Sequence, residues 1–323
     1  MQASENFGRA TQLFRAAERI NVIGHIRPDA DAIGSVCSVI LAARQLGKTA
    51  QGFIGQPEDF AANLRTIPGA DSVSASTTLA EADLVVVVDC GSISRTGIFK
   101  TALAESSMPM IVVDHHDSNR GFGTVDLIDH AAESTTTVLW QWFADMGIAI
   151  DQPLAHALYA GLVTDTGSFR WGSSRMHAMA ADLVQHGIDT RQIAAELIDN
   201  STLAGMKMLG AALGRIEVQP VGGRRLAVLY ARNDEIAGLD TSEVESLVDF
   251  VRGVDGADVG VVFKEYEPDW HAVSLRAIAD IDVSVIAARL GGGGHLRAAG
   301  YTCAGSREEN LRALKDVLLT MEN

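Results

Sequence analysis

Residues 110–116 read MIVVDHH, an uninterrupted apolar run that ends directly in Asp114, His115 and His116. A short apolar run rich in β-branched residues predicts a strand covered on both faces of a parallel sheet. The three polar side chains would then follow the carboxyl end of that strand, where open α/β sheets form their ligand crevices. Because carboxylates and imidazoles bind divalent cations, the stretch predicts an α/β fold with a metal site at one edge of its sheet.

Strand and helix patterns alternate over the first half of the chain. This alternation is typical of a mainly parallel sheet with flanking helices. Further strands are expected at 20–24, 84–88 and 124–128, and helices at 33–46, 135–146, 154–163, 178–183, 193–198 and 203–213.

After residue 214 the pattern changes to one of a smaller, mixed α/β domain. We therefore expect two domains, at 1–190 and 215–323, joined by a helical linker at 191–214. A length of 323 residues also favours two domains. The second domain should hold strands at 216–218, 226–230, 259–263 and 271–275, and helices at 242–251 and 284–290.

The composition excludes several classes of protein. Hydrophobic residues make up 47% and charged residues 21% of the chain, which excludes a disordered or collagen-like protein. A net charge of −15 argues against a surface that coats long duplex nucleic acid, since phosphates are neutralised by clustered Lys and Arg. A short anionic substrate is still compatible, because bound cations can reverse the local field.

Cysteine usage and hydropathy indicate the compartment. Cys37, Cys90 and Cys303 are widely spaced and form no C-x-x-C pair, so a reducing compartment is expected. The first residues lack the apolar core of a signal peptide, and no apolar run is long enough to span a bilayer. We expect a soluble cytoplasmic protein without membrane association.

Residues 24–35 read GHIRPDADAIGS and hold His25, Asp29 and Asp31 close together after a predicted strand. Pro28 stiffens the turn, and the helix that follows directs its positive end to the same place. An Asx turn with a helix N-cap is the better interpretation of an isolated D-x-D. The added histidine and proline favour metal ligands.

Two further aspartates end predicted elements. Asp89 follows the VVVV run at 85–88, where a buried carboxylate is costly unless it is paired or metal-bound. Asp165 ends a helical pattern in GLVTDTGSF, residues 161–169, where the negative end of the helix dipole disfavours a carboxylate. Each has an ordinary alternative: Asp89 could cap the next turn, and Asp165 could mark a simple helix stop.

The members of the opening triplet need different roles, because consecutive side chains of an extended chain point in different directions. One histidine would be a metal ligand, and the other an acid or a phosphate contact. Asp114 would orient its neighbours. A solvated polar loop is the alternative.

Residues 291–300 read GGGGHLRAAG. Four glycines leave backbone N–H groups accessible to an anion. His295 and Arg297 add donors, and Arg276 on a predicted strand could supply a fork for phosphate. A flexible hinge is the alternative, but the adjoining histidine and Ala-Ala-Gly favour a binding loop.

Taken in order, the four N-terminal segments resemble motifs I to IV of the DHH phosphoesterase superfamily. Residues 291–300 resemble the GGGH-x-x-AAG signature of the DHH-associated C-terminal domain. The arrangement is similar to the branch of nanoRNases, pAp phosphatases and hydrolases of cyclic di-AMP and pApA. The resemblance covers nearly the whole chain, and five motifs in order are highly specific.

The resemblance implies a catalytic first domain that holds two Mn²⁺ ions, with Mg²⁺ or Co²⁺ as substitutes. One ion would take His25, Asp29 and Asp89, and the other Asp31, Asp89, His115 and Asp165. Asp89 would bridge the two ions. No ligand position departs from the family pattern.

The resemblance also assigns the substrate contacts. His116 would face the scissile phosphate as a catalytic residue together with Asp89. Arg297 occupies a variable position of the signature. The second domain would bind substrate through Ser274, Arg276, Gly292, Gly293, Gly294 and His295.

The implied reaction is hydrolysis of short oligoribonucleotides, pApA and pAp, with cyclic di-AMP as a further candidate, by a hydroxide shared between two ions. A manganese inorganic pyrophosphatase shares the first four motifs but lacks the GGGH loop. A single-strand exonuclease of the superfamily is usually longer. A catalytically silent nucleotide sensor would not need six metal ligands. A homodimer is expected from the family.

Overall fold

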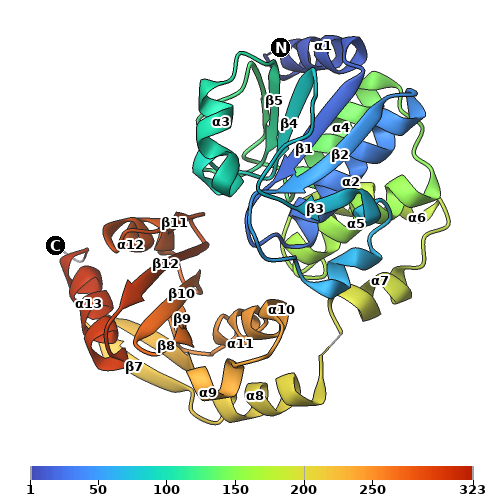
Figure 1. Cartoon of the computed structure of the whole chain (residues 1–323). Helices are drawn as coiled ribbons and strands as arrows, with labels where there is room; N and C mark the ends of the chain where they lie inside the picture. The colour runs from blue at the N-terminus through green and yellow to red at the C-terminus, as the bar shows by residue number, and fades with distance from the viewer. Residues whose placement is uncertain (1, 200, 322–323) are drawn as a thin grey trace. The chain divides into compact units, whose positions relative to one another are not determined.

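The computed structural model describes residues 2–199 and 201–321. The chain divides into two compact units, residues 1–200 and 201–323, and each contains a six-stranded sheet (Figure 1). The division falls inside the segment expected as a helical linker. Helix α7 (Thr190–Leu197) belongs to the first unit and α8 (Leu203–Leu213) to the second.

The sheet of the first unit is parallel throughout, as predicted from its uninterrupted apolar runs. Its strand order is β3-β2-β1-β4-β5-β6, so the order reverses between β1 and β4. In an open α/β sheet this reversal opens a crevice at the carboxyl ends of the two central strands. The strands are β1 (Arg19–Gly24), β2 (Thr49–Ile54), β3 (Val73–Ala75), β4 (Leu84–Val88), β5 (Met110–Asp114) and β6 (Val125–Ile128).

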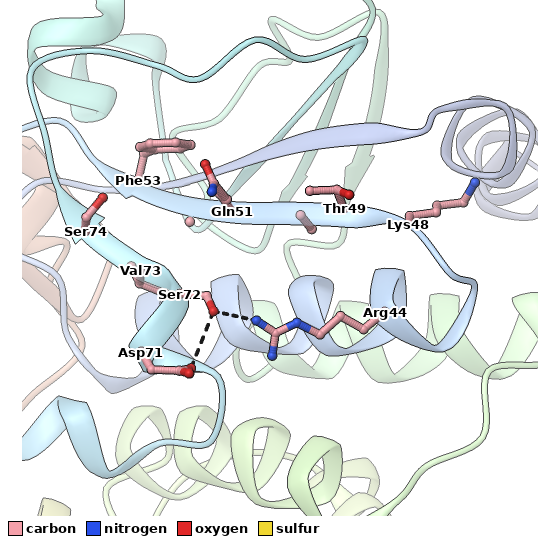
Figure 2. Close-up of a pocket in the computed structure, with 11 residues that line it drawn as sticks. Arg44, Lys48, Thr49, Gln51, Phe53, Asp71, Ser72, Val73 and Ser74 are labelled. Atoms are coloured by element: carbon pink, nitrogen blue, oxygen red, sulfur yellow. Dashed lines mark hydrogen bonds between the residues drawn. The ribbon is translucent and has the colours of Figure 1, made fainter.

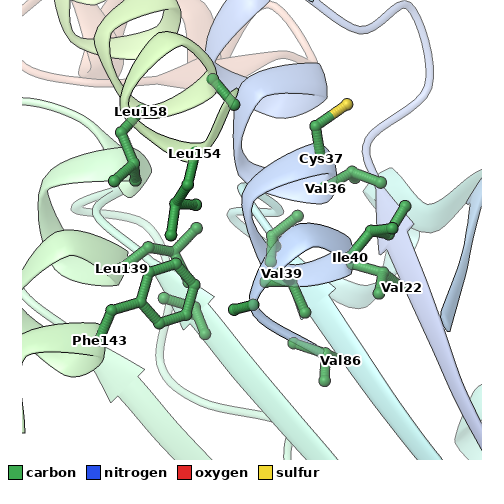
Figure 3. Close-up of a cluster of buried hydrophobic side chains, with 14 of the residues drawn as sticks. Val22, Val36, Cys37, Val39, Ile40, Val86, Leu139, Phe143, Leu154 and Leu158 are labelled. Carbon is green, nitrogen blue, oxygen red and sulfur yellow. The ribbon is translucent and has the colours of Figure 1, made fainter. Parts of the chain in front are cut away.

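The main core of the first unit lies between one face of this sheet and the helices α2 (Ala30–Gln45), α4 (Thr135–Met146) and α5 (Gln152–Asp165). Figure 3 shows side chains of these helices meeting those of β1 and β4. The other face packs against a 3-10 segment, Ile93–Phe99, and α3 (Lys100–Glu105). Helices α1 (Gln2–Ala16) and α6 (Ser174–Val184) complete the unit.

The second unit has a mixed sheet in the order β11-β12-β10-β9-β8-β7, in which only β8 and β9 pair in parallel among the described strands. The strands are β7 (Glu217–Val221), β8 (Arg224–Ala231), β9 (Val259–Glu267), β10 (Trp270–Ala277), β11 (Gly293–Gly294) and β12 (Ala298–Ala304).

Helices cover both faces of the mixed sheet. One face packs against α8, α9 (Asn233–Ile236), α10 (Thr241–Glu245) and α11 (Val248–Val251). The other packs against α12 (Val283–Arg289) and α13 (Arg307–Thr320). Among the described residues, no helix combines the length and apolar character needed to cross a membrane.

Two sequence expectations need correction. The single helix expected at 242–251 is two short helices, because the Ser246 hydroxyl donates to the carbonyl of Glu243 and interrupts the ladder between α10 and α11. The segment 291–300, expected as a loop, ends in β12, which pairs with β10 from Trp270 to Arg276.

Candidate active site

The metal-ligand candidates of the first unit converge at the carboxyl ends of the central strands. His25 follows β1, Asp89 follows β4, and His115 follows β5. Asp29 caps the N-terminus of α2, and Asp165 is the last residue of α5. Four segments of the sequence analysis therefore supply one cluster.

Asp89 lies between two groups of ligand atoms. Its Oδ2 is 3.4 Å from His25 Nε2, and its Oδ1 is 3.8 Å from His115 Nε2. The atoms of His25, Asp29 and Asp89 fall within 4.8 Å of one another, and so do those of Asp31, Asp89 and His115. His115 Nε2 is also 3.3 Å from Asp165 Oδ2, which adds Asp165 to the second group.

The donor set of these groups fits divalent cations. Carboxylate oxygens and imidazole nitrogens suit Mn²⁺ and neighbouring first-row metals, and the separations leave room for a cation between the partners. One oxygen of Asp89 faces each group. A shared carboxylate of this kind can serve two ions.

Asp89 adopts an unusual backbone conformation, with φ of 56°, and the residue is only 2% exposed. Left-handed backbone in a residue other than glycine is concentrated at functional sites, where surrounding contacts maintain it. One such contact is a hydrogen bond of 2.8 Å from the hydroxyl of Thr135 to Asp89 Oδ1. Thr135 was missed in the sequence analysis.

The N-terminus of α4 binds the buried carboxylate of Asp31. The backbone N–H groups of Thr135 and Thr136 donate to its two oxygens at 2.7 and 3.1 Å. Ser134 is the N-cap of this helix. The positive end of a helix stabilises a carboxylate placed there. In the sequence, the serine N-cap before the helical pattern predicts where this helix begins. It does not predict that the helix start binds Asp31.

The three residues of the opening triplet make different contacts. His115 Nδ1 contacts the carbonyl of Ala132 at 3.2 Å, which directs Nε2 to the ligand groups. His116 Nδ1 lies 2.8 Å from Asp114 Oδ1. Asp114 is fully buried, and its Oδ2 accepts from Asn119 at 2.6 Å. Asp114 therefore orients His116.

The charges of the cluster favour cation binding. Burial lowers the pKa of His25, but its hydrogen bonds to Asp29 and Asp89 raise it to about 10. Burial and the charge of Asp89 raise the pKa of Asp31 to about 7. Burial and the charge of Asp31 raise the pKa of Asp165 well above its ordinary value. Protons and divalent cations compete for such groups, so the same atoms that hold protons tightly can hold metal ions.

In the second unit, β12 aligns the segments proposed to bind substrate. Ser274 of β10 pairs with Gly300, and Arg276 pairs with Ala298. Gly293 of β11 also pairs with Gly300, on the other side of β12. His295 stands in the tight connection between β11 and β12.

The glycines have a steric role that the sequence analysis did not anticipate. A Cβ at Gly292 would lie 2.0 Å from the carbonyl oxygen of Gly300, and Gly294 has φ of 144°. The N–H of Gly292 donates to Ala287 and that of His295 to Ala298, both at 2.8 Å. These two N–H groups therefore donate to backbone carbonyl groups. The substrate contact of Gly292, Gly293, Gly294 and His295 stays a prediction.

Lys264 of β9 is a further polar residue that the sequence analysis missed. Its side chain is 2% exposed, and Nζ is 2.6 Å from Glu245 Oε1 and 2.9 Å from the hydroxyl of Ser274. A lysine that donates to a hydroxyl oxygen leaves the hydroxyl hydrogen to point to another acceptor. Lys264 thus makes Ser274 a donor.

A pocket of the first unit lies away from this cluster. Figure 2 shows a pocket of about 460 Å³ beside β2 and β3, with Arg44, Lys48 and Asp71 in its lining. The Arg44 guanidinium donates to Ser72 there. No metal-ligand candidate lines this pocket. The carboxylate and histidine cluster is therefore the stronger functional candidate.

Family models and known proteins agree with the fold. The model of the DHH family N-terminal domain matches residues 19–162, and that of the DHHA1 domain matches residues 225–321. The chain belongs to the DHH phosphoesterase family.

Individual proteins are similar to this chain over most of its length. The bifunctional oligoribonuclease and PAP phosphatase NrnA of Thermus thermophilus is 28% identical over 93% of this chain and 89% of its own length. The cyclic-di-AMP phosphodiesterase PdeA of Listeria monocytogenes is 27% identical over 89% of this chain and 45% of its own. An exopolyphosphatase-related protein of Bacteroides fragilis shares the fold, with a TM-score of 0.88, 22% identity and coverage of 98% and 96%.

Proposed function

We propose that the chain is an Mn²⁺-dependent phosphodiesterase and phosphatase that hydrolyses short oligoribonucleotides, pApA and pAp. Cyclic di-AMP is a further candidate substrate. The observation that carries the proposal is Asp89, whose two oxygens face two separate ligand groups. The names of the T. thermophilus and L. monocytogenes relatives support the choice of substrates.

Six side chains would hold two cations. One group is His25, Asp29 and Asp89, and the other is Asp31, Asp89, His115 and Asp165. The mixture of imidazole and carboxylate favours Mn²⁺ over Mg²⁺. The chemistry that such a pair supplies is a water of lowered pKa and stabilisation of charge on the phosphoryl oxygens.

His116 would act as the general acid. Burial lowers its pKa, but the hydrogen bond to Asp114 raises it above the ordinary value, which favours the protonated imidazole that a general acid requires. With Nδ1 held by Asp114, Nε2 is the atom that would protonate the leaving oxygen. Asp114 would keep the ring oriented throughout.

Ser274 and Arg276 would bind the substrate from the second unit. They are two residues apart on β10, so their side chains share one face of the sheet. Arg276 offers a fork of donors that matches phosphate, and Ser274 offers a hydroxyl oriented by Lys264. His295 would add a further donor beside β12.

A substrate panel tests the proposal. Purified protein with Mn²⁺ should hydrolyse pApA and pAp, while pyrophosphate and long single-stranded RNA should persist. Hydrolysis of pyrophosphate alone would identify a pyrophosphatase, and shortening of long strands an exonuclease. Product from none of them would indicate a nucleotide sensor. Light scattering of the same sample tests the homodimer that we include in the proposal.

A further inference from the structure

Residues 129–134 form the loop that joins β6 to α4, and this loop supports ligands of the second group. The carbonyl of Ala132 in the loop lies 3.2 Å from His115 Nδ1. The start of α4, which follows the loop directly, donates hydrogen bonds to the carboxylates of Asp31 and Asp89. The position of the loop therefore affects three ligands at once.

One guanidinium holds this loop in place. Arg175, the second residue of α6, donates from Nη1 to Asp129 Oδ2 at 2.8 Å and from Nε to Glu133 Oε2 at 3.1 Å. Its Nη2 donates to the carbonyl of Ala131. An arginine presents its donors in a rigid planar fork. Three acceptors on one loop therefore restrict the loop more than a single ion pair would.

The same contacts connect the loop to the segment that follows Asp165. Glu133 Oε1 accepts hydrogen bonds from the backbone N–H of Ser173, at 2.9 Å, and from the Ser173 hydroxyl. Ser173 is the N-cap of α6, and Asp165 is the last residue of α5. Arg175 and Glu133 thus join the chain before α4 to the chain after α5. These two segments contact or supply all four ligands of the second group.

The first group is held by other parts of the unit. The Asp29 carboxylate accepts from the N–H groups of Asp31 and Ala32 at the start of α2. His25 Nδ1 contacts the carbonyl of Ile26 at 2.9 Å. A change in the loop 129–134 should therefore affect the second group and not these contacts of the first.

We propose that Arg175 is a positioning residue for the second ligand group, and that its loss weakens the binding of one of the two divalent cations. The role rests on the proposed function, since it requires a cation at each group. Arg175 acts through the Ala132 carbonyl and the start of α4, and not on a cation or the substrate directly.

The test measures Mn²⁺ affinity by calorimetry in two backgrounds, each of which keeps one group intact. His25→Ala removes a ligand of the first group, and His115→Ala removes a ligand of the second. Loss of a residue that orients metal ligands costs about 10- to 100-fold in metal affinity, so Arg175→Gln should weaken Mn²⁺ binding to His25→Ala by about that factor. Binding to His115→Ala should not change. An equal loss in both backgrounds, or no loss in His25→Ala, would overturn the proposal.

Matched variants separate this role from charge and from folding. Arg175→Lys keeps the charge but not the fork, so it should recover only part of the affinity. Arg191→Gln removes an exposed arginine that is likewise the second residue of its helix, α7, and should leave both affinities unchanged. A loss in Arg191→Gln as large as that in Arg175→Gln would contradict the role.

Asp129→Asn covers the case in which Arg175→Gln does not fold. It keeps the Oδ1 that accepts from the N–H of Ala131, but replaces the oxygen that Arg175 binds. A smaller loss in the His25→Ala background alone is expected. Circular dichroism should show a folded chain, because partly exposed ion pairs contribute little to global stability. A folded Asp129→Asn protein with normal Mn²⁺ binding in that background would overturn the proposal.

The outcomes also distinguish this proposal from the proposed function. If the otherwise unmodified protein hydrolyses nothing but binds two Mn²⁺ ions, and Arg175→Gln weakens one binding step, the function fails and the role of Arg175 stands. If that protein is active and Arg175→Gln binds both ions normally, the function stands and the role of Arg175 fails. Absence of Mn²⁺ binding would overturn both.

Discussion

At the scale of single residues, the cluster is organised around carboxylates that would be unfavourable without partners. Burial raises the pKa of Asp89, but its hydrogen bond with His25 and the charge of His116 hold the pKa well below its usual range. Asp89 is therefore ionised in a buried position. The Thr135 hydroxyl satisfies one of its oxygens and leaves the carboxylate ready for cations.

Thr135→Val tests this supporting contact. Valine keeps the shape of the side chain but removes the donor to Asp89, so Mn²⁺ affinity or turnover should fall by about 10- to 100-fold. The fold should persist. Thr137→Val is the matched control, because its buried hydroxyl contacts Ser134 instead of a ligand. Equal Mn²⁺ affinity and equal turnover for both variants would contradict the role given to Thr135.

The sequence could predict the ligand candidates but not their neighbours. His25, Asp29 and His115 carry chemistry that is visible in the residue type and in their position after apolar runs. Thr135 reaches the cluster through the fold, from a helix start that no local pattern connects to it. The role of Asp89 was ambiguous in the sequence, because an aspartate is common both in the turn after a strand and in a metal site.

At the scale of elements, the site depends on close approach between helices. Gly161 of α5 faces the start of α4, and a Cβ there would lie 2.3 Å from Asp31 Oδ1 and 2.6 Å from Thr136 Cγ2. The absence of a side chain lets α5 pass beside the ligand carboxylate. Gly210 of α8 has nothing within 4 Å of a Cβ.

Gly161→Ala and Gly210→Ala should therefore have opposite effects on stability. Alanine favours a helix over glycine by about 1 kcal/mol, so Gly210→Ala should raise the free energy of unfolding. At Gly161 the clash should lower it and displace Asp31, with weaker Mn²⁺ binding. Denaturant titration and calorimetry measure both quantities. A Gly161→Ala protein that is more stable and binds Mn²⁺ normally would refute this packing argument.

The long apolar strands of the first unit were predictable, because their burial on both faces leaves continuous runs such as 84–88. Strand β12 was not, because its Ala-Ala-Gly start was part of the glycine motif. The glycines were expected to expose N–H groups, whereas Gly292 and Gly294 satisfy steric demands against β12. Only the pairing of strands distinguishes a glycine that exposes its N–H group from one that permits close packing.

At the scale of the whole molecule, protons stabilise the metal-free protein. The pKa of His25 is raised to about 10 and that of Asp31 to about 7, from ordinary values of about 6.5 and 3.9. The folded protein binds these protons more tightly than the unfolded chain does. Their contribution to stability is full below the ordinary values and is lost as pH rises through about 7 and then 10.

Mn²⁺ affinity should accordingly increase from about pH 6 to pH 9, because the cations must displace these protons. The metal-free protein should lose stability over the same range, and Mn²⁺ should restore it. Thermal unfolding with and without Mn²⁺ across this range, and proton release measured by calorimetry in two buffers, check the prediction. A Mn²⁺ affinity that is independent of pH would contradict it.

The two units should contribute to different kinetic constants. Ser274→Ala removes one hydrogen bond to phosphate, so KM for pApA should rise about tenfold while Mn²⁺ affinity is unchanged. Ser246→Ala, in the same unit but bonded to the Glu243 carbonyl, is the control. A loss confined to kcat would argue against a binding role for Ser274.

The division into two α/β units could be predicted, because the change of pattern after residue 214 is local in the sequence. The strand order of the first sheet could not. It places β1 next to β4 and so brings His25 beside Asp89, through contacts that short-range periodicity does not encode.

The most direct test of the account is Mn²⁺-dependent hydrolysis of pApA by Asp89→Asn. Asparagine keeps the size of the side chain but removes the charge that both ligand groups share. We predict no turnover above background, with an unchanged circular dichroism spectrum, while the exposed Asp145→Asn control retains full activity. Retained turnover by Asp89→Asn would contradict the central claim.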